Sequence, residues 1–203
     1  GQPDWDYTKL FMLFGVAEDH DSNPIKMGIG KIKARGAKII AVNPIRTGYN
    51  AVADDWVGIT PGTDGLLILA IVHELLKAGK IDLNYLANYT NAPVLLDTRT
   101  GLIMRSNDGK QLVIDRSTGK ITAFDQKGVR PNLNGQHIKD GLVHKTVFNS
   151  IVKRYLSSEY DPSAVAKKVG ISAGRIRAIA AELARVAFDE AFELDQEWTD
   201  FRG

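Results

Sequence analysis

The 203-residue sequence has no cysteine and no apolar segment long enough to cross a bilayer. Without cysteine, these residues form no disulfide, thiolate zinc site, cysteine-ligated iron–sulfur cluster or cysteine nucleophile. The longest apolar run, residues 66–72, is far shorter than the roughly 20 residues of a membrane-spanning helix. The N-terminal residues lack the basic and apolar regions of a signal peptide. We therefore expect no direct membrane insertion, and the sequence is compatible with a cytoplasmic or a periplasmic location.

Neither sign of charge dominates, since 26 basic residues face 24 acidic ones and the net charge is +2. This balance gives no reason to expect a nucleic acid or a charged membrane surface as a partner. With 44% hydrophobic and 25% charged residues, the chain has the composition of a globular protein with one core, or one core and a smaller second one. The sequence does not start with methionine and ends on aromatic residues without an evident partner, so we expect a piece of a larger protein.

The first part of the chain predicts a strand, a helix and a second strand. Residues 9–14 are apolar and end at Gly15, and a polar loop leads to Pro24, which suits the first turn of a helix. Gly36 can end that helix in the left-handed conformation. Residues 37–42 then form an apolar run typical of a buried parallel strand. A helix between two such strands is the crossover that a parallel sheet requires.

Turn and capping residues predict the elements that follow. Residues 57–60 fit a short third strand, and Thr63 or Asp64 can cap a well-buried helix that ends at Gly79. Asp82 can cap a further short helix. The sequence thus predicts an α/β core with a mostly parallel, Rossmann-like sheet and flanking helices, which we assign to residues 1–92.

The pattern changes after this core. Two segments with aspartate followed by glycine four residues later, Asp97 to Gly101 and Asp115 to Gly119, predict two β-hairpins. Residues 126–141 are rich in Gly, Asn and Gln and suggest an extended linker, so we assign residues 93–141 to a β-hairpin insertion and linker. Residues 142–203 are expected to be a helical segment that packs back on the core, with helix starts at Thr146, Asp161 with Pro162, and Ser172, and a helix end at Gly170.

Open parallel sheets bind ligands at the carboxyl ends of their strands, and the first candidate site lies there. It is the loop from Gly15 to Asn23, which leads into a helix whose free N–H groups could hold a phosphate. The loop is not a G-x-G-x-x-G motif and carries three acidic residues. A phosphate cradle and an ordinary polar turn are both compatible with these residues.

Two more candidates follow the second and third strands. Asn43 stands where dinucleotide folds contact a ribose, and Arg46 could bind a phosphate bidentately; the alternative is a turn with a surface arginine. In the Pro-Gly-Thr-Asp segment around Gly62, the Asp64 carboxylate could accept two hydrogen bonds from guanine or simply cap a helix. The four histidines are scattered without metal-ligand spacing, so we predict no metal site among them. The absence of a catalytic residue from this chain is an expectation that the resemblance described below implies.

A hypothesis of a different class comes from residues 164–179. Here a helix, a turn containing Gly170 and a second helix with Arg175 and Arg177 have the pattern of a DNA-binding helix-turn-helix. The same pattern also occurs in helical hairpins that only pack. A third hypothesis is a scaffold that keeps the nucleotide fold without its site.

Considered together, these motifs resemble the molybdopterin oxidoreductases of the dimethyl sulfoxide reductase family. The resemblance rests on the order and spacing of Gly15, Asn23-Pro24, residues 36–46, Ala53-Asp54, residues 61–64 and the late segment 160–180. The late match disfavours the DNA-binding alternative. The resemblance implies bis(molybdopterin guanine dinucleotide) with molybdenum or tungsten as cofactor. It places Gly15 and Asn23 near phosphates, Asn43 and Arg46 at ribose or phosphate, and Gly62 with Asp64 at the guanine.

The resemblance also implies what this chain lacks. The metal ligand and the substrate loops of that family lie in other segments, and an iron–sulfur cluster is expected in the rest of the full-length chain. We therefore expect a cofactor-binding portion of a catalytic subunit that has no turnover alone. The resemblance implies two partners, the rest of the catalytic subunit and an electron-transfer subunit. It implies no nucleic-acid partner.

Overall fold

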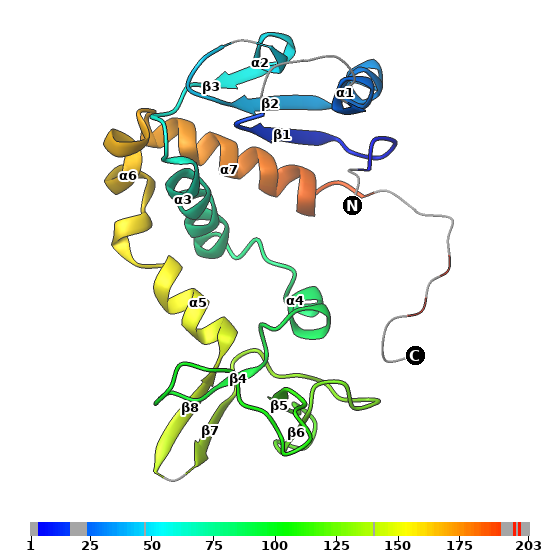
Figure 1. Ribbon diagram of the computed structural model, residues 1–203, viewed down its shortest axis with the longest axis vertical. Helices are drawn as coiled ribbons and strands as arrows, with labels where there is room; N and C mark the ends of the chain where they lie inside the picture. Colours follow the sequence, from blue (N-terminus) through cyan, green and yellow to red (C-terminus); the bar gives the residue numbers. More distant parts are fainter. Residues whose placement is uncertain are drawn as a thin grey trace. The chain divides into compact units, whose positions relative to one another are not determined.

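The computed structural model (Figure 1) describes residues 4–16, 24–46, 48–139 and 141–191, together with Glu197 and Thr199. The chain divides into two compact units, one from residues 1–80 with 157–193 and one from residues 81–156 with 194–203. These boundaries differ from the three segments that the sequence suggested, because the chain leaves the first unit after the helix that ends near Gly79 and returns to it for the last helices. Each unit is described separately.

The first unit contains a three-stranded parallel sheet. Its strands are β1 (Leu10–Phe14), β2 (Lys38–Val42) and β3 (Asp55–Val57), in the order β1-β2-β3. Helix α1 (Pro24–Ala34) connects β1 to β2, and the short helix α2 (Tyr49–Val52) precedes β3. The predicted α/β fold with a parallel sheet is therefore confirmed. The third strand lies slightly earlier than expected, since residues 58–60 follow it as loop.

Helices cover both faces of this sheet, as Figure 1 shows. Helices α3 (Asp64–Lys77), α6 (Pro162–Val169) and α7 (Ala173–Phe188) share one core with the strands. Its central buried side chains are Ile40, Val42, Val57, Leu67, Val165, Ile176 and Ile179. On the other face, Leu13 and Ile39 pack with Ile29 and Ile32 of α1 and with Tyr49 of α2. Burial of such side chains contributes about 1.5–3 kcal/mol each, which accounts for the strongly apolar strands.

Helices α6 and α7 begin at the residues that the sequence indicated, and α6 also ends where it was expected to end. After a short 3-10 turn (Ser158–Tyr160), the Asp161 carboxylate accepts a hydrogen bond from the Ser163 backbone N–H at 2.8 Å. Gly170 ends α6 in the left-handed conformation with φ of 84°. Ser172 caps α7 by accepting from the Arg175 N–H at 3.1 Å. These local bonds satisfy backbone donors that a helix start leaves free.

The second unit combines two helices with short antiparallel strands. Helix α4 (Leu83–Tyr89) is capped by Asp82, and α5 (Val147–Tyr155) is capped by Thr146 in a capping box with Asn149. The strands β4 (Leu95–Leu96), β8 (Leu142–Thr146) and β7 (Gln136–Lys139) form one sheet in this order. Strands β5 (Leu112–Ile114) and β6 (Ile121–Ala123) form a hairpin. No helix within the described ranges combines the length and apolarity needed to span a membrane.

Both turns predicted from the aspartate and glycine spacing are present. The Gly101 N–H donates to the Asp97 carbonyl at 2.7 Å, and the Gly119 N–H donates to the Asp115 carbonyl at 2.8 Å. The expected linker 126–141, however, contains β7, a strand with one apolar residue, Ile138, that is 70% exposed. Such a polar edge strand has no hydrophobic alternation of its own, and it forms because β8 pairs with it.

Candidate functional site

The carboxyl ends of the three parallel strands lie at one edge of the sheet. In the strand register, Phe14 pairs with Val42 and Val42 pairs with Val57. The ladder continues one step beyond the strands, because the Gly15 N–H donates to the Val42 carbonyl at 3.0 Å and the Asn43 N–H donates to the Val57 carbonyl at 3.1 Å. The structure therefore brings together Gly15 and Asn43, two of the residues that the sequence assigned to a nucleotide site.

Backbone geometry at this edge leaves room for a ligand. Gly15 has φ of 56°, and a Cβ placed on it would meet nothing within 4 Å. The polar loop after it, with the predicted phosphate contact Asn23, lies outside the described residues. Of the two predicted phosphate contacts, Gly15 belongs to the described residues. Glycine is suited to this position because side chains rarely adopt a positive φ.

Asn43 begins a turn that is held by its backbone. The Trp56 indole N–H donates to the Asn43 carbonyl at 2.9 Å, and the Asn43 side-chain oxygen accepts from the Ile45 N–H at 3.5 Å. The Asn43 side-chain amide donates to no other described residue. Arg46 is exposed and forms no ion pair within the described part of the chain. These two side chains thus retain donors for a ribose hydroxyl or a phosphate.

Asp54, which belongs to the motifs of the family resemblance, serves the fold. Its carboxylate accepts from the Ile39 backbone N–H at 2.8 Å and pairs with the Lys33 ammonium at 3.1 Å. The Ile39 hydrogen bond, followed by the Lys33 charge, lowers the pKa of Asp54 below its usual value. The Asp54 N–H also donates to the Ile39 carbonyl at 3.0 Å. Asp54 therefore ties the segment before β3 to β2.

Hydrogen bonds to the backbone hold the loop that leads into α3, and the Asp64 carboxylate has no partner among the described residues. The Thr63 hydroxyl donates to the Thr60 carbonyl at 2.7 Å, and Gly62 has φ of 79° with open space at its Cβ position. Thr63, whose side chain makes no capping bond, is the N-cap of α3. Asp64 is the first residue of the helix, is partly buried, and has no hydrogen-bond or ion-pair partner among the described residues. It is thus not the side-chain cap that the sequence also allowed.

The α6–α7 hairpin supports this loop. The Thr60 N–H donates to the Val169 carbonyl at 2.9 Å, and a Cβ on Gly170 would lie 2.9 Å from the Thr60 hydroxyl oxygen. The close approach requires glycine at position 170. Sequence reasoning identified Gly170 as a helix end but gave no signal for its contact with Thr60, because the two residues are far apart along the chain.

The arginines of α7 are engaged in ion pairs within the fold. Arg175 pairs with Asp55 at the start of β3, and Arg177 pairs with Asp161 at 3.2 Å and approaches Glu74 to 3.8 Å. Ile176 and Ile179 of the same helix are buried in the core. A DNA-reading helix needs its basic face free for phosphates and bases, so this packing does not favour the helix-turn-helix hypothesis.

One cluster of potential metal ligands occurs in the described residues. The side chains of His73, Glu74 and Asp161 each offer a ligand atom, and these atoms lie within 4.8 Å of one another. Two cations share the same carboxylates, since Lys77 lies 3.7 Å and Arg177 3.2 Å from Asp161. The protein's own cations therefore offset the negative charge that would attract a metal ion, and the cluster is an ion-pair network between α3, α6 and α7.

The chain is similar in sequence to parts of several longer redox proteins. No family model matches. The chain is 40% identical to a sulfite dehydrogenase subunit of Allochromatium vinosum over 98% of this chain and 22% of that protein. It is 29% identical to a putative dimethyl sulfoxide reductase catalytic subunit of Halobacterium salinarum over 75% of this chain and 19% of that protein. It is 26% identical to the alpha subunit of perchlorate reductase from Dechloromonas aromatica over 63% of this chain and 14% of that protein.

A solved structure has the same fold. The acetylene hydratase from Pelobacter acetylenicus superposes with a TM-score of 0.51 at 18% sequence identity, over 91% of this chain and 17% of that chain. The chain spans about a fifth of the length of the first two relatives. The sequence similarities, which cover nearly the whole chain in the sulfite dehydrogenase, agree with the family resemblance seen in the motifs. The chain belongs to the molybdopterin oxidoreductase family and represents a part of its catalytic subunits.

Proposed function

We propose that this chain contributes part of the binding site for a molybdopterin guanine dinucleotide. Membership of the family itself implies a molybdenum cofactor; the guanine dinucleotide form is our proposal. The observation that carries it is the alignment of the strand ends, which puts Gly15 and Asn43 side by side at the edge where parallel sheets bind ligands. Arg46 and Asp64 follow along the chain, and neither side chain has an ion-pair or hydrogen-bond partner among the described residues.

The residues present fit the parts of such a cofactor. Gly15 would lie near its phosphates, the Asn43 amide would pair with a ribose hydroxyl, and the Arg46 guanidinium would meet a phosphate. The family resemblance adds Asn23, which is outside the described residues, as a further phosphate contact. The open Gly62 turn would let the base approach the start of α3. There the Asp64 carboxylate would accept hydrogen bonds from the N1–H and amino group of guanine. When bound, the metal and pterin supply the redox chemistry, and the protein supplies position and electrostatics.

The remaining parts of the proposed enzyme lie outside this chain. They include the metal ligand, the substrate loops and an iron–sulfur cluster, and the further partner is an electron-transfer subunit. Relatives in Allochromatium vinosum and Dechloromonas aromatica are named as individual subunits of their enzymes, which is compatible with such an assembly. Which substrate the whole enzyme uses depends on the segments outside this chain.

Titration with guanine nucleotides tests the proposal. We expect the protein that contains this chain, freed of cofactor, to bind GMP more tightly than AMP by isothermal titration calorimetry. The variant Asp64→Ala should lose about tenfold or more in GMP affinity, since hydrogen bonds to a charged group are among the stronger ones. The AMP affinity should hardly change, because adenine lacks the donor pair that the carboxylate accepts.

The matched control is Asp125→Asn, which removes an acidic charge in the second unit, where Asp125 pairs with Lys110 at 3.1 Å. Equal losses of GMP affinity in both variants would point to a general charge effect and would refute the role of Asp64. Salt-dependent binding of duplex DNA that is lost in Arg175→Ala would instead support the helix-turn-helix hypothesis.

A further inference from the structure

The second unit contains a concave site that the proposed cofactor binding does not use. Its cavity of about 980 Å³ is bordered by α4, the turn after β5 and residues 130–134. Ligand pockets for small organic molecules commonly measure roughly 300–1,000 Å³. All of its lining residues belong to the second unit. The site is therefore complete within one compact part of the chain.

The charges on this cavity are all positive. Arg116 and Arg130 line it, and no acidic residue does. Neither guanidinium forms an ion pair or a side-chain hydrogen bond within the described residues. The backbone holds the two arginines on adjacent segments, because the Arg116 N–H donates to the Arg130 carbonyl at 2.7 Å. Two guanidinium groups without an ion-pair partner among the described residues make this hollow a candidate site for an anion.

The Asp115 carboxylate precedes Arg116 in the chain and forms an ion pair with neither guanidinium of the cavity within the described residues. Asp115 accepts from the Ser117 N–H at 3.0 Å, from the Ser117 hydroxyl at 2.9 Å and from the Thr118 hydroxyl at 2.9 Å. These hydrogen bonds lower the pKa of Asp115. Asp115 also accepts from the Arg130 backbone N–H at 3.4 Å. Its carboxylate therefore fixes the backbone from which both arginines project.

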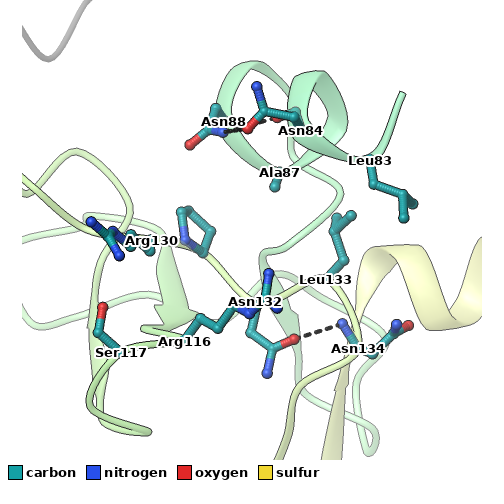
Figure 2. Close-up of a pocket in the computed structure, with 11 residues that line it drawn as sticks. Leu83, Asn84, Ala87, Asn88, Arg116, Ser117, Arg130, Asn132, Leu133 and Asn134 are labelled. Carbon is teal, nitrogen blue, oxygen red and sulfur yellow. Dashed lines mark hydrogen bonds between the residues drawn. The ribbon is translucent and has the colours of Figure 1, made fainter. Parts of the chain in front are cut away.

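Amide side chains provide the remaining polar groups of the cavity. Asn84 and Asn88 come from α4, and Asn132 and Asn134 come from the opposite wall. The Asn132 side-chain oxygen accepts from the Asn134 N–H at 3.1 Å, which orients its amide (Figure 2). Amides both donate and accept, as hydroxyl groups on a ligand require. The apolar part of the cavity wall consists of Leu83, Ala87, Pro131 and Leu133.

Figure 2 shows how the arginines are distributed in this space. Arg116 and Arg130 come from neighbouring segments, and the Arg130 side chain lies on the side of the view away from Leu83 and Asn134. Two positive charges on one cavity match the charge of about −1.5 to −2 on a phosphate monoester more closely than the single charge of a carboxylate. A guanidinium also binds phosphate bidentately.

We propose that this cavity binds the phosphate group of a small, hydroxylated phosphate ester, with Arg116 as the main anchor. Arg130 strengthens the positive potential, and the Asn84 and Asn132 amide N–H groups pair with hydroxyl groups of the ester. The inference is independent of cofactor binding at the parallel sheet, because no residue is shared between the two sites. The functional consequence is a second ligand site in the part of the chain that carries the β-hairpins.

Calorimetric titrations with three probes test the proposal on the protein that contains this chain. Inorganic phosphate measures the anion site, ribose 5-phosphate measures the ester, and ribose serves as the neutral control. We expect ribose 5-phosphate to bind more tightly than inorganic phosphate, and ribose to bind very weakly. Arg116→Gln should weaken ribose 5-phosphate binding by about tenfold or more, since charge-assisted hydrogen bonds are lost.

The matched control is Lys139→Gln, which removes one positive charge from β7 of the same unit, outside the cavity lining. It should leave the affinity for ribose 5-phosphate within about twofold of the unmodified protein. Equal losses in both variants, equal binding of ribose and its phosphate, or no binding of either phosphate probe would overturn the proposal. Asp64→Ala should leave this binding unchanged, so a failure of the cofactor proposal is distinguished from a failure here.

Discussion

The Asp54 carboxylate shows how one side chain stabilises the edge of the parallel sheet. It accepts from the N–H of Ile39, a residue that is fully buried. The substitution Asp54→Ala removes this acceptor and leaves a buried donor unpaired. We expect the free energy of unfolding of the first unit to fall by about 1–3 kcal/mol, measured by urea denaturation with the Trp56 environment as the fluorescence probe.

The same carboxylate predicts a pH dependence. Because its pKa is lowered in the folded state, Asp54 stabilises the fold above its unfolded pKa and loses this contribution as the pH falls through the folded value. The stability difference between the unmodified protein and Asp54→Asn should thus be largest near about pH 7 and shrink below about pH 4. Glu159→Gln is the control, since Glu159 is exposed and forms no ion pair with the described residues. A difference that grows as the pH falls would contradict this assignment.

At the scale of elements, the turn between α6 and α7 determines where the Thr60 loop lies. Gly170 combines a positive φ of 84° with a Cβ position only 2.9 Å from the Thr60 hydroxyl oxygen. We expect Gly170→Ala to lower the free energy of unfolding by about 1–3 kcal/mol, because the left-handed conformation alone costs an alanine about 1–2 kcal/mol. Thermal and urea denaturation measure this loss.

The neighbouring glycine provides the control. Gly174 lies within α7 and is exposed, and a Cβ built on it would lie 4.0 Å from the Ser172 hydroxyl oxygen. Gly174→Ala should leave stability unchanged or raise it by up to about 1 kcal/mol, since alanine favours helix over glycine. If both variants were equally stable, the contact between the α6–α7 turn and the Thr60 loop would not support the loop.

Local signals in the sequence predicted most of the helices and turns. Caps such as Thr146 and Ser172, and the glycine after α6, act within a few residues of themselves and can be recognised without knowledge of the tertiary fold. The pairing of β4 with β8 and the edge strand β7 could not be predicted in this way. Their hydrogen bonds join segments that are far apart in sequence or carry no alternation.

The candidate sites show the same difference between local and long-range signals in the sequence. Gly15 and Asn43 could be placed together because each directly follows an apolar strand, and parallel strands end at one edge. No local pattern in the sequence indicates that Arg175 pairs with Asp55. The arginine therefore also fitted the DNA-binding hypothesis. The cavity of Arg116 and Arg130 was missed for a similar reason, because a hairpin turn and the residues after it bring the two arginines to one wall.

At the scale of the whole molecule, each unit has its own hydrophobic cores. The first unit buries Ile176 with the strands of the parallel sheet, and the second unit buries Val113 with Val94 and Val129. Cores that lie within separate units can unfold in separate cooperative steps. Hydrogen exchange, which resolves protection amide by amide, is the measurement suited to this question.

We expect Ile176→Ala to reduce the exchange protection of the β2 amides and to leave that of the β5 amides unchanged. Ile176 is fully buried, so the truncation should destabilise the first unit by about 2–5 kcal/mol. Val113→Ala is the reciprocal variant, because Val113 is also fully buried and lies in β5. It should reduce protection in β5 and β6 only. If either variant lowered protection equally in both units, the chain would unfold as one cooperative body and the separate cores would not give separate unfolding steps.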